Sequence, residues 1–177
     1  MMEDTSTLGQ RTPEWFKARL GHIPSSMVYN VMLKPTAKAA KEGETFSDTA
    51  KSYLYKVAAE RNISEPYLNG QFDEWLERTN VETRAMRYGT ENEDMARNIY
   101  ELQLDGDLSV VQAGFVRHNE IPNYGDSPDG VVVDGGSNPV GCIEIKCPNS
   151  DTWMRYKALF AQGRTLKEIE EKYYWQC

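Results

Sequence analysis

The chain has 177 residues, with 27 acidic and 20 basic residues and a formal net charge of -7. This length is typical of one domain, and the acidic balance excludes a uniformly basic surface, so any contact with nucleic acid has to be local. No apolar run reaches the ~18 residues of a membrane span, and no signal peptide follows Met1, so we expect a soluble intracellular protein with no membrane contact. Three cysteines without Cys-x-x-Cys spacing favour reduced thiols over disulfides or a zinc site.

Two helices are predicted near the amino terminus. Thr12 is a typical N-cap and Pro13 suits the first helical position. A second helix begins near Ser25, where free backbone N–H groups lie beside the hydroxyls of Ser25 and Ser26, with Arg19 close in sequence. These groups favour an anion pocket. Ordinary serine capping and a surface arginine are the competing interpretation.

Residues 34–45 carry spaced lysines without an apolar face, which predicts a mobile surface loop. Ser47 then caps a longer helix. Further along, residues 108–118 predict one continuous strand. His118 at its end has no recognisable partner in the sequence, so we expect it to be structural.

A further helical pattern has Met95, Ile99 and Leu102 at helical spacing, which predicts that these residues form its buried face. Glu93 lies about one turn after Gly89, so its side chain can reach past this small residue to a site outside the helix. A solvated acidic helix face is the alternative for Glu93.

The segment from residue 124 to 148 carries the most informative pattern. Strong β-formers at 131–133 and 140–145 flank the turn residues 135–138, which predicts a β-hairpin with a four-residue loop. We expect Asp134 to pair with Pro139 across this loop.

The same register places Val131 opposite Cys142 and Asp129 opposite Glu144, because positions equidistant from the turn pair in an antiparallel ladder. Side chains alternate along a strand, so Lys146 shares the face of Glu144. Opposed carboxylates are destabilising unless a cation lies between them, and hard oxygen ligands suit Mg²⁺. Lys146 is then placed to hold or deprotonate a water. The alternative is a turn aspartate followed by a solvated strand edge.

The carboxyl-terminal part reads as two amphipathic helices, with Asp151 and Thr165 as N-caps. The second pattern continues to Cys177 without a stop signal, so we expect a chain that is cut short in mid-helix.

Six motifs occur in a fixed order along the chain: W-F-K-A-R-L-G, I-P-S-S, Y-G-T-E-N-E, S-P-D-G, E-I-K-C-P and Y-Y-W-Q. Together they resemble the lambda exonuclease (YqaJ-type viral recombinase) branch of the PD-(D/E)XK nucleases. The resemblance implies an α/β, mixed α+β fold: a restriction-endonuclease-like core with a mixed central sheet flanked by helices, and an amino-terminal helical segment. Residues 1–177 would form a single nuclease domain that lacks the family's carboxyl-terminal elements.

The resemblance also implies roles for particular residues, which fall into a metal centre and a pocket for the 5′-phosphate of the digested strand. The catalytic set is Asp129, Glu144, Lys146, Glu93 and Gln176; the metal ligands are Asp129, Glu144, Glu93 and the carbonyl of Ile145; the 5′-phosphate pocket is Arg19, Ser26 and Ser127.

The implied activity is Mg²⁺-dependent 5′-to-3′ exonuclease digestion of double-stranded DNA ends in phage-type recombination, with Mn²⁺ as a substitute metal. The implied partners are a homo-trimer around DNA and a single-strand annealing protein, in the cytoplasm of a bacterial host. Two alternatives stay open: an endonuclease of the same superfamily, and a non-catalytic or truncated nuclease-fold module that binds DNA ends or a protein partner.

Overall fold

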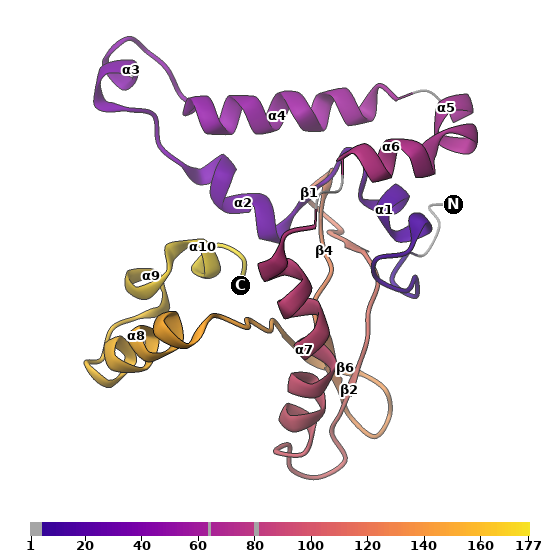
Figure 1. Ribbon diagram of the computed structural model, residues 1–177, viewed down its shortest axis with the longest axis vertical. Coiled ribbons are helices and arrows are strands. Elements are labelled where there is room, and N and C mark those ends of the chain that lie inside the picture. Colours follow the sequence, from indigo (N-terminus) through magenta and orange to yellow (C-terminus); the bar gives the residue numbers. More distant parts are fainter. Residues whose placement is uncertain (1–4, 64, 80–81) are drawn as a thin grey trace.

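The computed structural model describes residues 5–63, 65–79 and 82–177. Within them the chain forms ten helices and six short strands (Figure 1). In chain order these are α1 (Pro13–Arg19), β1 (Ile23–Pro24), α2 (Ser25–Met32), α3 (Ala37–Lys41), α4 (Asp48–Arg61), α5 (Glu65–Gly70), α6 (Phe72–Thr79), α7 (Arg84–Glu101), β2 (Ser109–Val111), β3 (Val116–Arg117), β4 (Tyr124–Asp126), β5 (Gly130–Val133), β6 (Pro139–Ile143), α8 (Ser150–Ala161), α9 (Leu166–Ile169) and α10 (Glu171–Tyr174).

The strands form two three-stranded sheets, with the orders β1-β4-β3 and β2-β5-β6. Only β1 and β4 pair in parallel, and the other neighbours are antiparallel. The single strand predicted over 108–118 is wrong, because β2 and β3 belong to different sheets. The chain leaves β2 after Val111 and turns inward, so that Phe115 is fully buried before β3 begins. Burying this aromatic ring outweighs continuing the ladder.

The hairpin of β5 and β6 follows the predicted register at Val131, which pairs with Cys142. The predicted pairing of Asp134 with Pro139 is wrong: Val133 pairs with Pro139, and a bulge lies between this pair and Val132. Asp134 instead organises the loop, since its Oδ1 accepts hydrogen bonds from the N–H groups of Gly136 and Asn138, both at 2.9 Å. An Asx-type turn therefore shifts the pairing by one residue at the tip alone.

The central core joins the amino-terminal helix to the sheets. Trp15 and Ala18 of α1 pack with Phe115, and Leu8 and Phe16 lie against this cluster. The burial of two large aromatic rings fixes α1 against the β3–β4 side of the molecule.

Most predicted helix starts are confirmed by side-chain caps. Thr12, Ser47 and Thr165 each accept a hydrogen bond from the first turn of the helix that follows. Asn149 rather than Asp151 caps α8, so that prediction is displaced by two residues. The predicted loop at 34–45 contains the short helix α3, capped by Thr36.

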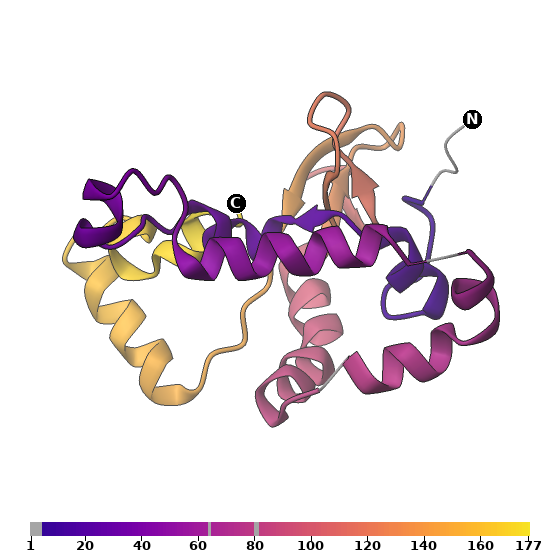
Figure 2. The ribbon, with the colours of Figure 1, turned by 90° about the horizontal axis from the view of Figure 1, so that it is seen from above.

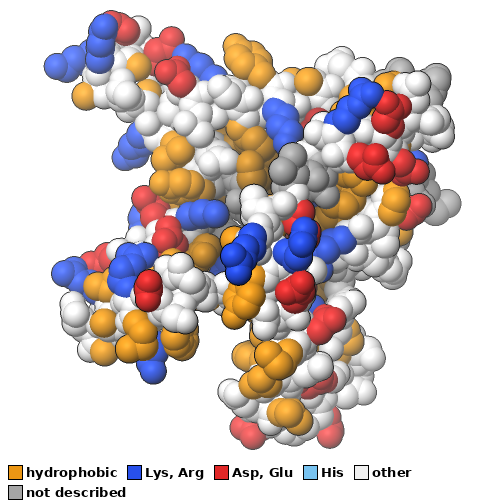
Figure 3. All heavy atoms as spheres, viewed as in Figure 1, with side chains coloured by type: hydrophobic (Ala, Val, Ile, Leu, Met, Phe, Trp, Pro, Cys, Tyr) orange, Lys and Arg blue, Asp and Glu red, His pale blue; other side chains and the backbone are white. Residues whose placement is uncertain are grey.

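The buried face of α7 differs from the prediction. Met95, Ile99 and Leu102 are 58%, 50% and 85% exposed, while Glu93 and Arg97 are buried. Figure 3 shows apolar side chains exposed over the lower part of this helix. The two buried charges neutralise each other, with Arg97 Nη2 2.9 Å from Glu93 Oε1. A hydropathy pattern treats charged residues as exposed even when they are buried as a pair, so the spacing of the apolar residues indicated the wrong face of α7.

Helices α8, α9 and α10 form a group to one side of the sheets, joined to β6 by an extended segment (Figures 1 and 2). The single helix predicted after Thr165 is broken at Glu170, whose φ is -153. The Tyr156 hydroxyl donates a hydrogen bond of 2.9 Å to Glu170 Oε2, which links the break to α8. No helix in the described part of the chain is long and apolar enough to span a membrane.

Candidate active site

Asp129 lies in the short connection that carries the chain from β4 in one sheet to β5 in the other. The next residue, Gly130, pairs with Ile143 in the last pair of the β5–β6 ladder, so Asp129 and Glu144 lie just beyond the end of this ladder. A Cβ at Gly130 would lie 2.5 Å from Val110 Cγ1, well inside van der Waals contact, so a larger residue would have to displace the Val110 side chain. Close packing of β2 on β5 thereby holds Asp129 at the strand end.

A hydrogen bond closes the gap between Asp129 and the segment after β6. The Ile145 N–H donates to Asp129 Oδ2 at 2.6 Å. Because Ile145 follows Glu144 directly, the two acidic residues are held at the same end of the hairpin, as the register predicts.

Glu144 also contacts two other residues predicted to be catalytic, Lys146 and Gln176. Its Oε1 accepts hydrogen bonds from Lys146 Nζ and from Gln176 Nε2. Gln176 follows α10, so the carboxyl-terminal helices contribute a residue to the centre. Lys146 Nζ also lies 5.3 Å from the centre of the Tyr173 ring.

The pKa values of both carboxyl groups are raised. Burial raises the pKa of Glu144 to about 7, and the nearby charge of Asp129 adds to this effect. Burial also raises the pKa of Asp129, although the hydrogen bond from the Ile145 N–H opposes the shift. A bound cation would relieve both penalties. Since Mg²⁺ usually takes one or two carboxylates together with water and substrate phosphate, the donor set fits this ion.

Glu93 lies near enough to Asp129 for its charge to raise the pKa of that residue, but its carboxylate is paired with arginines. Its Oε1 accepts a hydrogen bond from Arg97 and its Oε2 pairs with Arg11. Within residues 5–63, 65–79 and 82–177, no three His, Cys, Asp or Glu side chains are grouped as a metal site. The structure therefore brings Asp129 and Glu144 together and leaves Glu93 bound to two arginines.

The residues predicted to hold the 5′-phosphate come from α1, the start of α2 and the connection after β4. Parallel pairing sets Pro24 beside Gly125, and the chain continues on one side into α2 at Ser25 and on the other side to Asp126. The buried Ser25 hydroxyl donates a hydrogen bond to Asp126 Oδ1.

Trp15 connects the other pocket residues and was not singled out by the sequence. Its indole N–H donates to Ser127 Oγ at 3.0 Å, and the Arg19 guanidinium lies 4.0 Å from its ring centre. Burial lowers the pKa of Arg19, and the charge of Asp126 opposes that shift. The available signal was the i, i+4 spacing of Trp15 and Arg19 on one helix.

The family model for the YqaJ-like viral recombinase domain matches residues 14–177. The chain belongs to this family. No curated protein matches the sequence significantly.

Two solved structures also resemble this YqaJ-like chain. An alkaline exonuclease (LHK-Exo) from Laribacter hongkongensis superimposes with a TM-score of 0.60 and 29% identity, over 93% of this chain and 64% of that chain. LHK-Exo in complex with dAMP gives a TM-score of 0.61 and 30% identity, over 93% and 65%. The α/β fold predicted from the sequence is confirmed by this likeness. The YqaJ-like chain spans just under two thirds of the length of these relatives.

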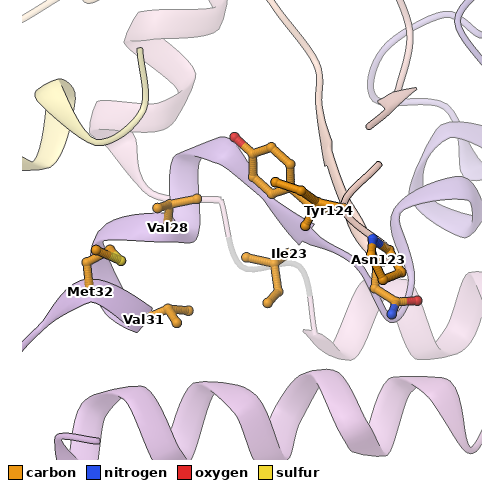
Figure 4. Close-up of a pocket in the computed structure, with 8 residues that line it drawn as sticks. Ile23, Val28, Val31, Met32, Asn123 and Tyr124 are labelled. Atoms are coloured by element: carbon orange, nitrogen blue, oxygen red, sulfur yellow. The ribbon is translucent and has the colours of Figure 1, made fainter. Parts of the chain in front are cut away.

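Of two hollows in the described part of the YqaJ-like domain, one adjoins Glu144 of the acidic pair and the other is lined by neither acidic residue. One of about 190 Å³ has Glu144 and Lys146 on its wall, together with aromatic side chains of the carboxyl-terminal helices, namely Trp153, Tyr156, Phe160 and Tyr173. The other, of about 340 Å³, is lined mainly by apolar side chains of α2 and of the residues before β4 (Figure 4). Of these two hollows, the smaller one adjoins Glu144 and Lys146.

Proposed function

We propose that this chain carries the active centre of a Mg²⁺-dependent exonuclease that digests double-stranded DNA from the 5′ end. The observation that carries the proposal is the arrangement of Asp129, Glu144 and Lys146 at one end of the β5–β6 hairpin. Membership of the YqaJ-like family and likeness to an alkaline exonuclease support the exonuclease part of this proposal.

In this proposal, Asp129, Glu144 and the carbonyl of Ile145 hold Mg²⁺, with Mn²⁺ as a substitute. When bound, the metal supplies charge stabilisation to the phosphate and to the leaving 3′-oxygen. Lys146 orients a water, or accepts its proton, for in-line attack on phosphorus. Gln176 holds the Glu144 carboxylate by its amide, and Glu93 contributes from α7 once its carboxylate is free of Arg11.

The pocket of Arg19, Ser26 and Ser127 would bind the terminal 5′-phosphate. Ser127 and Asp129 are two residues apart in one connection, so a phosphate held at Ser127 places the first phosphodiester beside the acidic pair. Charge-assisted hydrogen bonds from Arg19 and from the N–H groups at the start of α2 suit the doubly charged 5′-phosphate at a DNA end.

The aromatic hollow beside Glu144 and Lys146 suits the base of the nucleotide that is removed, since aromatic faces stack with any base. LHK-Exo has been crystallised with dAMP, a mononucleotide. We infer that the products of this chain are 5′-mononucleotides.

The proposal extends to the partners expected from the family resemblance. These are double-stranded DNA ends, two further copies of the chain in a trimer around the duplex, and a single-strand annealing protein. A role in phage recombination would place the protein in the cytoplasm of a bacterial host.

Incubation with linear duplex DNA and with covalently closed circular DNA, in Mg²⁺ or in EDTA, tests the proposal. We expect 5′-mononucleotides from the linear substrate in Mg²⁺ and no product from the circle. Cutting of the circle would favour an endonuclease. Binding of DNA ends without any product in Mg²⁺ or Mn²⁺ would favour a non-catalytic module.

A further inference from the structure

Arg97 is a buried cation in the middle of α7, with only 7% of its surface exposed. The sequence pattern did not predict this burial. A buried charge is costly unless it is paired and hydrogen-bonded, so the contacts of Arg97 have to compensate.

The guanidinium of Arg97 makes three contacts in three directions. Nη2 donates to Glu93 Oε1 at 2.9 Å and Nη1 donates to Asp94 Oδ1 at 2.7 Å, both on its own helix. Nε donates to the backbone carbonyl of Asp129 at 2.6 Å. Asp94 is 78% exposed at its side chain, so the other two contacts are the buried ones.

These two buried contacts join the elements that supply acidic groups to the proposed metal site. Glu93 belongs to α7, and Asp129 lies in the connection between the two sheets. On its far side, Asp129 Oδ2 accepts the Ile145 N–H next to Glu144. A continuous path of hydrogen bonds therefore runs from Glu93 through Arg97 and Asp129 to the segment after β6.

We propose that Arg97 is a positioning residue for the metal site: it fixes the backbone of Asp129 and the carboxylate of Glu93 in one rigid unit without touching metal or DNA. The inference rests on the proposed metal-dependent function. The Arg97 guanidinium is a planar fork of donors with a fixed geometry. A lysine carries one ammonium group on a flexible stem, so it cannot hold both Glu93 and the Asp129 carbonyl.

The test is Mn²⁺ binding by the DNA-free protein, measured by isothermal titration calorimetry after removal of EDTA. Groups that orient metal ligands typically affect metal affinity by 10–100-fold. We expect Arg97→Lys to weaken Mn²⁺ binding by about tenfold or more. Arg87→Lys is the matched control, because Arg87 is an exposed arginine of α7 whose Nε contacts Glu82 at 3.0 Å; its affinity should equal that of the parent.

The melting temperature in EDTA separates positioning from stability. A purely structural role would lower the melting temperature of Arg97→Lys and leave the Mn²⁺ affinity of the folded protein unchanged, which would overturn the inference. If Arg97→Lys fails to fold, Arg97→Gln is the second variant. It leaves no unpaired buried cation and keeps Arg11 as a partner for Glu93, and the same loss of affinity is expected.

The parent protein separates this inference from the proposed function. Parent binding of Mn²⁺ with equal binding by Arg97→Lys or Arg97→Gln contradicts the role of Arg97 alone. Absence of Mn²⁺ binding by the parent contradicts the metal site itself, and the positioning role with it.

Discussion

The acidic centre and the end pocket are assembled in different ways. Asp129, Glu144 and Lys146 come from one hairpin, and their convergence follows from strand register and a single N–H contact. In the proposed pocket, the indole of Trp15 joins α1 to the β4–β5 connection, and Ser25 at the start of α2 contacts Asp126. A hairpin places its residues locally, whereas the pocket depends on the packing of the whole amino-terminal region. Changes at the centre should stop the chemistry, and changes at the pocket should alter which DNA ends are used.

The largest effect is expected from Glu144→Gln, which removes a ligand charge and keeps the side-chain shape. Cleavage of every DNA end should fall by more than the roughly 10–100-fold that residues outside the ligand shell contribute. Release of nucleotides from linear duplex DNA measures it, and circular dichroism checks the fold. Glu91→Gln, at an exposed position of α7, should retain the parental rate. Parental activity of Glu144→Gln would show that the metal centre lies elsewhere.

Lys146→Ala should lower the turnover number by about 10²–10⁴, the usual contribution of a general acid or base, while Mn²⁺ still binds. Single-turnover kinetics and calorimetry measure the two quantities separately. Lys167→Ala is the control, because Lys167 lies 5.0 Å from the ring centre of Tyr174 without contacting Glu144. An equal loss of metal affinity in Lys146→Ala would make this lysine a structural partner of Glu144 instead.

Arg19→Ala tests the end pocket separately from the acidic centre. It removes a charge-assisted contact of roughly 1.5–3 kcal/mol that exists only when the end carries a phosphate. The preference for 5′-phosphate over 5′-hydroxyl ends should therefore fall roughly ten- to hundredfold. Lys17→Ala, an exposed cation of the same helix, should leave the preference unchanged. Equal slowing on both ends would indicate general backbone binding, with a changed salt dependence.

The smallest effect concerns pH. The pKa of Glu144 is raised from 4.5 to about 7 in the folded protein, so between these values the folded state binds a proton that the unfolded state releases. Stability from this group is therefore present below pH 4.5 and is lost as the pH rises towards 7. In EDTA, the melting temperature of the parent should fall relative to that of Glu144→Gln between pH 5 and pH 8. A pH-independent difference would contradict the raised pKa.

Local features of both regions could be predicted from the sequence. The N-caps at Thr12 and Thr165 depend on hydrogen bonds within a few residues, and the pairing of Val131 with Cys142 depends on a short loop. The bulge at the hairpin tip was missed because the Asp134 side chain competes with the ladder for the loop N–H groups.

Features that depend on distant partners could not be predicted. Trp15 and Ser127 are 112 positions apart, so no local pattern links them. The buried face of α7 was misjudged because the partner of Arg97 outside its own helix is a backbone carbonyl, at Asp129. A carbonyl is present at every residue, and its availability to a buried arginine emerges only from the packing of the helix on the sheets.

Initial rates on linear duplexes that differ only in a 5′-phosphate or a 5′-hydroxyl, with each strand labelled in turn, test the central claim most directly. That claim is that the acidic pair acts on a DNA end whose 5′-phosphate is held by Arg19, Ser26 and Ser127. In Mg²⁺ we expect the phosphorylated end to be digested roughly ten- to hundredfold faster, with nucleotides lost from the 5′ terminus and no digestion in EDTA. Equal rates on both ends, or nucleotides lost first from the 3′ terminus, would contradict it.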